Sequence, residues 1–245
     1  MTRPLLTIKK KNSGRDVQGH VSVRHRGGEH KRYLRLLDLN RLPDIEAKVV
    51  AIEYDPNRTA KLAKIVYTNG RFSYILATAA MKVGQKIISS ESATITDGNR
   101  LPLRSIPPGI PFHCLQMFPQ KPAQMVMSAG SAAYLQSLDG SKAVVKLPSG
   151  EIRQFSSDCW VTIGQVSFPE HANIKLRKAG DSRRRGIRPS VRGVAQHPDS
   201  HPHGGGEGRS SVGMNPKTPW GRPAMGKRTR SRKKSSSKLI IKRRR

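Results

Sequence analysis

A short segment rich in histidine and glycine carries the residue types best suited to chemistry. Residues 201–209 contain His201 and His203, followed directly by Gly204, Gly205 and Gly206. Consecutive glycines let a backbone approach another surface closely and present unobstructed N–H groups to phosphate oxygens. A flexible linker is the alternative explanation of a glycine run, but Gly–Ser linkers rarely carry histidines with flanking arginines such as Arg192 and Arg209. The segment therefore predicts a contact with phosphate groups.

Two other kinds of chemistry need partners that the sequence does not supply. His197, His201 and His203 carry imidazoles that can bind zinc, but no cysteine lies nearby and Pro202 restricts the backbone. Imidazole titrates near neutrality, as a general base must, but the sequence places neither a nucleophile nor an orienting carboxylate beside His201. We therefore expect no metal site, no cofactor, no catalytic residue and no small-molecule substrate.

The net charge indicates the kind of partner. The 245 residues include 46 Lys and Arg against 16 Asp and Glu, a formal charge of +30, so the expected partner is nucleic acid. Residues 42–180 hold 16 basic side chains against 10 acidic ones, whereas residues 181–245 hold 19 against 3 and residues 1–41 hold 11 against 3. The two ends should therefore bind the polyanion. An aromatic content of only 5% favours folded RNA, gripped through phosphates and 2′-hydroxyls.

Cysteine usage and hydropathy bear on the compartment. Cys114 and Cys159 are too few and too isolated for a disulfide framework, so we expect free thiols in a reducing compartment. No apolar run approaches the roughly 20 residues of a membrane span. We therefore expect no membrane span.

Short strands separated by turns fill the middle of the chain. A hairpin turn is predicted at Asn69-Gly70. Five short strands without a long helix predict a small barrel such as an OB-fold. These strands are Ala47–Tyr54, Leu62–Tyr67, Arg71–Leu76, Gln85–Ile88 and, closing the unit, Phe112–Met117.

A second series of strands predicts a second small barrel of the SH3-like kind. Its strands are Ala132–Leu138, Ala143–Leu147, Ile152–Phe155 and Trp160–Ser167. A short helix is expected over Ala172–Ala179, ended by Gly180 as a C-terminal cap. The predicted organisation is mainly β: a basic N-terminal extension (1–41), an OB-fold-like RNA-binding domain (42–117), an SH3-like barrel domain (118–180) and a basic C-terminal extension (181–245).

The extensions lack residues that could form a core. Beyond Gly180, and over most of residues 1–32, the chain should therefore order only on RNA. Residues 227–234 and 242–245 are basic tracts, which are more often nonspecific polyanion contacts than sequence readers. Trp220 can either stack on a base or sugar, or pack on the extension itself.

Several motifs together point to one family. They are Lys11-Asn12-Ser13-Gly14-Arg15, Arg24-His25-Arg26-Gly27-Gly28, Glu53-Tyr54-Asp55-Pro56-Asn57-Arg58, Tyr74-Ile75-Leu76, Ser128-Ala129-Gly130, Arg188-Pro189-Ser190-Val191-Arg192-Gly193, the 201–209 segment and Thr218-Pro219-Trp220-Gly221. Along nearly its whole length the chain resembles large-subunit ribosomal protein two in its bacterial and organellar form. Each motif alone is weak, but the combination is highly specific.

The resemblance implies an architecture and a set of partners. It implies an OB-fold followed by an SH3-like barrel, with both extensions threaded into large-subunit rRNA. The glycine-rich loop would reach toward the peptidyl transferase region, and the protein would support subunit association and tRNA binding. His201 matches a family histidine long discussed in connection with peptidyl transfer, and it is carried over as an RNA-positioning residue because the family's chemistry is attributed to rRNA. The implied partners are rRNA, other ribosomal proteins and the small subunit, with Mg²⁺ entering only through the rRNA.

Composition and resemblance together predict a set of RNA-binding residues. They are Arg15, Arg24, His25, Arg26, Arg58, Arg183, Arg184, Arg185, Arg188, Arg192, His201, His203, Gly204, Gly205, Gly206, Arg209, Trp220, Lys227, Arg228, Arg230 and Arg232.

The sequence also departs from the family pattern. Glu29 stands where a third glycine is usual, Val126-Met127 replaces an expected Ala-Arg pair, and Ser200 replaces an acid before His201. With the shortened N-terminal extension, these departures favour the mitochondrial ribosome in the matrix, with the bacterial cytoplasm or a plastid as the alternatives.

Two functions compete with this interpretation. A free basic nucleic-acid-binding regulator would be expected to carry a recognition helix or a dimerisation element, and the pattern predicts neither. A histidine-dependent hydrolase or transferase using His201 would be active as purified, RNA-free protein.

Overall fold

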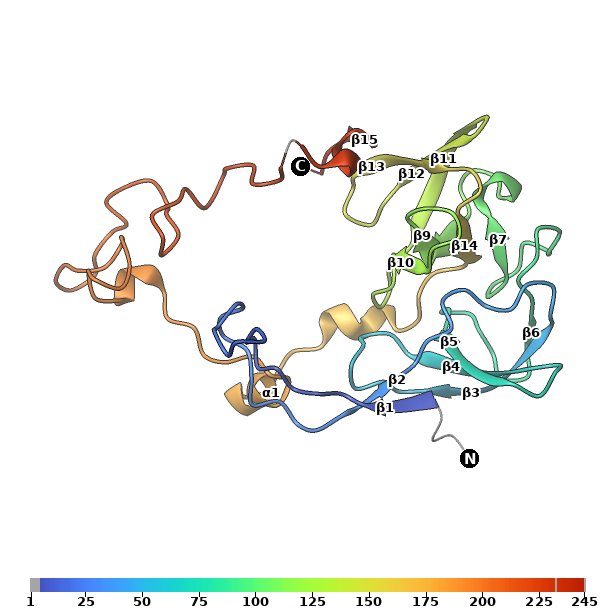
Figure 1. Ribbon diagram of the computed structural model, residues 1–245, viewed down its shortest axis with the longest axis horizontal. Coiled ribbons are helices and arrows are strands. Elements are labelled where there is room, and N and C mark those ends of the chain that lie inside the picture. Colours follow the sequence, from blue (N-terminus) through green and yellow to red (C-terminus); the bar gives the residue numbers. More distant parts are fainter. Residues whose placement is uncertain (1–4, 232, 245) are drawn as a thin grey trace. The chain divides into compact units, whose positions relative to one another are not determined.

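The computed structural model describes residues 5–231 and 233–244, and it is mainly β, as predicted. Its internal contacts divide the chain into two parts. We call residues 5–9, 31–175 and 234–244 the barrel unit, and residues 10–30 and 176–233, without residue 232, the extension unit. All the strands of the described residues lie in the barrel unit, whereas the extension unit is mostly irregular chain (Figure 1).

A four-stranded antiparallel sheet forms the first half of the barrel unit, in the order β5-β4-β3-β6. In β4, one of the two central strands, Leu62, Ala63, Ile65 and Tyr67 are all buried. The predicted hairpin is confirmed, because Tyr67 donates its N–H to the carbonyl of Arg71 at 2.9 Å across the turn. The strands are β3 (Ala47–Glu53), β4 (Leu62–Tyr67), β5 (Phe72–Leu76) and β6 (Lys86–Ile87), close to the predicted ranges.

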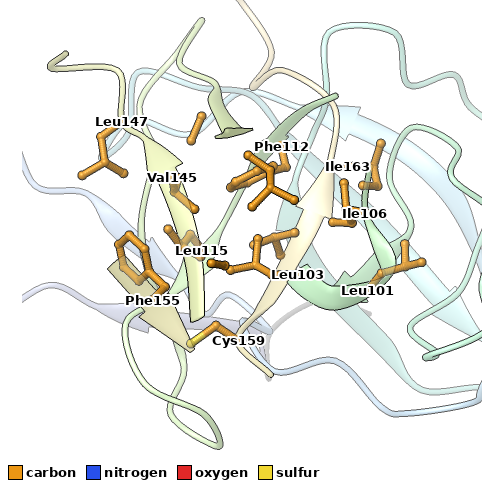
Figure 2. Close-up of a cluster of buried hydrophobic side chains, with 14 residues drawn as sticks. Leu101, Leu103, Ile106, Phe112, Leu115, Val145, Leu147, Phe155, Cys159 and Ile163 are labelled. Atoms are coloured by element: carbon orange, nitrogen blue, oxygen red, sulfur yellow. The ribbon is translucent and has the colours of Figure 1, made fainter. Parts of the chain in front are cut away.

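A seven-stranded sheet forms the second half, in the order β15-β13-β12-β11-β8-β14-β7. Its core is a cluster of apolar side chains that includes Phe112, Leu115 and Val145, all with 0% exposure (Figure 2). The strands are β7 (Arg100–Pro102), β8 (Pro111–His113), β11 (Ala133–Asp139), β12 (Lys142–Lys146), β13 (Ile152–Ser156), β14 (Trp160–Ile163) and β15 (Ile240–Lys242).

The prediction that Phe112–Met117 closes the first barrel was wrong. β8 pairs with β11 and β14 in the second sheet, whereas β9 (Leu115–Gln116) pairs with β10 (Ala123–Met125). Cys114 separates β8 from β9 and adopts a left-handed φ of 50°, a conformation that breaks a strand. A further strand of the second sheet, β7, precedes this segment and was not predicted.

A third apolar cluster joins the two sheets. Tyr74 and Leu76 of β5 pack in it with Cys114, Ala123 and Val166. Val166 also forms an isolated antiparallel bridge with Thr78. The predicted strand over Trp160–Ser167 stops at Ile163, because Gly164 turns the chain with φ 101°. A separate antiparallel pair joins β1 (Leu6–Ile8) to β2 (Tyr33–Arg35), so part of the N-terminal extension is ordered against the barrels.

The helix predicted over Ala172–Ala179 was also wrong. Pro169 instead starts a 3-10 turn that ends at Asn173, and the next residue, Ile174, has an extended backbone. The α-helix α1 (Ala179–Arg184) begins only later, and Gly180 lies inside it rather than capping its end. The other short 3-10 turns are η2 (Leu103–Ser105), η4 (Gly193–Ala195) and η5 (Ser235–Ser237), with η3 being Pro169–Asn173.

The C-terminal extension returns to the barrel unit. β15 pairs with the edge strand β13, and Gln154 donates its N–H to the carbonyl of Leu239 at 2.8 Å. The expectation that everything beyond Gly180 orders only on RNA was therefore wrong here. An apolar segment, Leu239-Ile240-Ile241, finds an open sheet edge, which is a ready template for pairing. Within the described residues, no helix has the length and apolar character needed to cross a membrane.

Candidate nucleic-acid interface

The extension unit concentrates the positive charge. Residues 10–30 and 176–233 hold 20 of the 46 Lys and Arg but only 5 of the 16 Asp and Glu. This is a net +15 on 79 residues, whereas the other 166 residues share the remaining +15. Such a density of one sign is sustained by a polyanionic partner rather than by internal ion pairs.

Two segments far apart in the sequence pair to build the extension unit. Arg26 and Ile187 form an antiparallel bridge. Gly27 donates its N–H to the carbonyl of Gly186 at 2.9 Å, and Arg188 donates to the carbonyl of His25 at 3.0 Å. The side-chain Nδ1 of His25 also lies 2.9 Å from the carbonyl of Pro189. Residues 10–30 therefore form one structure with the segment after residue 176, a feature that no local sequence pattern signals.

Glu29 lies beside Gly186 in this pairing. Its side chain packs beside Gly186, where an added Cβ would meet the Cβ of Glu29 at 3.1 Å. Lys11 donates through Nζ to the Glu29 carbonyl. The acid that replaces a family glycine thus occupies space that another glycine leaves open.

Most of the predicted RNA-binding side chains are exposed on the extension unit. Arg183 is half-buried and donates to the carbonyl of Ile187 at 3.3 Å, and Arg184 lies 3.7 Å from Asp181. Arg232 lies outside the described residues. The exposed ones are Arg15, Arg24, His25, Arg26, Arg184, Arg185, Arg188, Arg192, Arg209, Trp220, Lys227, Arg228 and Arg230.

His201 is the exception, because it is buried with only 8% exposure. Its ring stacks on that of His203, with 5.0 Å between the centroids. Its Nδ1 accepts the backbone N–H of His203 at 3.1 Å, so the ring proton of this tautomer lies on Nε2. His201 therefore shapes the loop from inside rather than presenting its ring to a ligand.

His203 links this loop to the next segment of the extension unit. Its Nε2 accepts the backbone N–H of Lys217 at 2.7 Å, and its Nδ1 lies 3.4 Å from the carbonyl of Val212. The two histidines together hold residues 193–217 in one arrangement. We call this arrangement of His201 and His203 the histidine clasp.

The glycines around the clasp are required by contacts within the chain. A Cβ added to Gly193 would lie 2.5–2.8 Å from the His201 ring. A Cβ on Gly204 would lie 2.5 Å from the carbonyl oxygen of His197 and 2.6 Å from that of Gln196. Gly204 is therefore needed for packing the loop on itself, an explanation that the linker and phosphate-contact interpretations both missed. Gly205 and Gly206 have φ near +90°, which other residues rarely adopt.

Trp220 is displayed at the tip of a short hairpin. Lys217 and Pro223 form an antiparallel bridge, and Thr218 donates its N–H to the carbonyl of Arg222 at 2.7 Å. The indole is 74% exposed, and the guanidinium of Arg24 lies 5.2 Å from its ring centroid. This distance is within the range of a cation–π contact.

Several arginines of the barrel unit contact groups within that unit. Arg58 lies 3.7 Å from the fully buried Asp55, and Arg35 lies 3.7 Å from the same carboxylate. Arg41 donates to the carbonyl of Gly98 at 2.5 Å. Burial and the nearby Arg41 lower the pKa of Arg100 to about 10, and burial lowers that of Arg41. Among the residues predicted to bind RNA, Arg58 therefore lies in the barrel unit and has a buried structural partner.

Within the part of the chain that the structure describes, the histidines do not form a metal-binding cluster. His197 and Asp199 lie 3.1 Å apart, but both side chains are largely exposed. Within residues 5–231 and 233–244, no three His, Cys, Asp or Glu side chains gather as metal ligands would. Burial raises the pKa of both Cys114 and Cys159 to about 11, which keeps these thiols protonated and poorly nucleophilic.

Two small β-sheets joined to a polycationic, irregular unit define a structural RNA-binding protein. Two family models match the chain: "Ribosomal Proteins L2, RNA binding N-terminal domain" over residues 2–89 and "Ribosomal Proteins L2, C-terminal domain" over residues 96–221. The large ribosomal subunit protein uL2 of Paraburkholderia phymatum is 48% identical over 241 residues, which cover 98% of this chain and 88% of that protein.

The chain therefore belongs to the ribosomal protein L2 family. It is a structural constituent of the large ribosomal subunit and not an enzyme. The predicted OB-fold, followed by an SH3-like domain, agrees with the family and with the two curled sheets.

Proposed function

We propose that the extension unit is the surface through which this chain grips large-subunit rRNA. The observation that carries the proposal is the separation of roles among the arginines. Those of the extension unit are mostly exposed, whereas Arg41, Arg58 and Arg100 of the barrel unit have internal partners. Phosphate contacts supply most of the affinity of such proteins.

The histidine clasp positions the glycine-rich loop in this proposal. His201 is buried, so it acts on RNA through the loop that it shapes, and Gly204 to Gly206 present the backbone. The resemblance to the family supports placing this loop toward the peptidyl transferase region. It also supports a role in subunit association and a contact with the small subunit.

The compartment is a further part of the proposal. The departures from the family pattern at Glu29 and Ser200 favour the mitochondrial ribosome. The relative from Paraburkholderia phymatum favours the alternative, the bacterial cytoplasm.

The proposed rRNA-binding surface of the extension unit is tested by reversing the charges of two matched sets of residues. Arg188, Arg192 and Arg209 of the extension unit are changed together to Glu, and Lys82, Lys142 and Lys146 of the barrel unit serve as the control. All six are exposed. Binding of the full-length chain to large-subunit rRNA is measured across a salt series.

The extension variant should bind more weakly, and the slope of log affinity against log salt should fall by about 2–3, because each lost phosphate contact removes roughly 0.7–0.9. The barrel variant should keep the slope of the unmodified chain. Equal losses in the two variants would contradict the proposal.

A further inference from the structure

The Trp220 hairpin has the parts of a binding site for a single nucleobase. One face of the indole is covered by the guanidinium of Arg24, 5.2 Å from the ring centroid. A cavity of about 370 Å³ lies beside the hairpin and is lined by Trp220 and Arg222. This volume is within the roughly 300–1,000 Å³ of small-ligand sites.

The hairpin holds the indole in place without burying it. Gly221 donates its N–H to the carbonyl of Thr218 at 2.9 Å, and the Arg222 N–H donates to the Thr218 hydroxyl at 3.2 Å. Pro219 and Pro223 restrict the backbone further. An aromatic side chain that is 74% exposed on a restrained turn has no apolar core to fill, and it is a ready stacking surface.

We infer that Trp220 stacks on one unpaired base of the rRNA, extruded from its helix, while Arg222 contacts the phosphate of that nucleotide. The base lies on the indole face opposite Arg24, and the cation–π contact of Arg24 fixes the ring. Base-paired RNA does not fit, because its bases are stacked between neighbours and offer no free face. This inference rests on the proposed rRNA-binding role of the extension unit.

Tryptophan fluorescence of the full-length chain tests this site directly. The chain has two tryptophans, and the Trp160→Phe variant leaves Trp220 as the only reporter. A single-stranded RNA oligonucleotide and a blunt duplex of the same sequence and length are titrated separately. The single strand should quench Trp220 emission, because a stacked base quenches an indole. The duplex should bind through its phosphates and leave the emission unchanged.

Substitutions in the same assay distinguish stacking from charge. Trp220→Ala should lower the affinity for the single strand at least about fivefold, the low end of the effect of one stacked base, and leave duplex affinity unchanged. Trp220→Phe should retain most of the affinity because it keeps an aromatic face. Arg222→Ala should weaken single-strand binding more than Lys227→Ala, a charge-matched change outside the cavity.

Three outcomes would overturn the inference. Equal quenching by single strand and duplex would show no preference for an unpaired base. Binding of both RNAs without quenching would remove the stacking site while leaving the proposed rRNA-binding role intact. If neither the single strand nor the duplex bound, both the site and the proposed function would be rejected.

Discussion

The residue that the family resemblance singles out has a structural role in this chain. His201 is buried, accepts the N–H of His203 and packs against Gly193. A ring held in this way orders a loop, and the neighbouring serine, Ser200, supplies no carboxylate. In the proposed function, the groups that face phosphate are the loop backbone and the arginines around it.

Packing at Gly204 gives a prediction about this loop. Gly204→Ala should destabilise the folded loop by about 1–3 kcal/mol, the usual range for overpacking, and thereby weaken rRNA binding, because its Cβ would meet two backbone carbonyl oxygens. Gly180→Ala is the matched control, since a Cβ there meets nothing within 4 Å. Affinities of the two variants for large-subunit rRNA provide the comparison, and similar values would refute the packing argument.

His113 gives a prediction about pH. Burial, with the nearby Arg41, lowers its pKa from 6.5 to about 4, although its hydrogen bond to the Gly164 carbonyl opposes the change. Between pH 6.5 and about 4 the unfolded chain binds a proton that the folded chain does not, so the free energy of unfolding should fall as the pH falls. The loss should reach about 3 kcal/mol near pH 4 and be absent above pH 6.5.

The His113→Asn variant keeps a donor but cannot titrate in this range. Denaturant unfolding at pH 7 and pH 4.5 should therefore show a smaller loss of stability for the variant than for the unmodified chain. Identical losses would mean that the titration of His113 does not cause the loss of stability at low pH.

At the scale of the elements, the barrels depend on residues that connect several strands. Phe112 of β8 has 0% exposure and lies in the main core cluster, whereas Phe118 is 44% exposed. Phe112→Ala should lower the free energy of unfolding by about 3–5 kcal/mol, and Phe118→Ala should change it by about 0.5 kcal/mol or less. Denaturant titration of both variants gives these values, and comparable losses would contradict the assigned core.

Local patterns predicted some elements and not others, for physical reasons. β4 and the hairpin at Asn69-Gly70 follow from alternation and turn chemistry within a few residues, and both are confirmed. The partner of β8 and the pairing of β15 with β13 depend on contacts between distant segments, which local patterns do not encode. The helix was misplaced because Gly180 was interpreted as a cap, although it lies within α1.

The candidate site was predictable in composition but not in geometry. The exposed arginines follow from charge density alone. The burial of His201 depends on how residues 193–204 fold on themselves, whereas the contact between Arg24 and Trp220 depends on how two distant segments meet. No local signal in the sequence indicates either.

At the scale of the whole molecule, charge and core are separated. Changing Arg228 and Arg230 together to Glu should reduce incorporation into large subunits while moving the Tm of the free chain by no more than about 4 °C, because each surface change usually alters stability by less than about 0.5 kcal/mol. Gradient fractionation and thermal unfolding measure the two effects. A drop in Tm as large as that of Phe112→Ala would show that the extension and the barrels are not energetically separate.

The central claim is that this chain is a structural rRNA-binding protein of the large ribosomal subunit. The most direct measurement is the sedimentation of the native, untagged protein in gradients of cell or organelle lysate, with and without ribonuclease. The protein should migrate with large subunits, and this migration should collapse when the RNA is digested. Migration as a small free protein, unaffected by ribonuclease, would contradict the account.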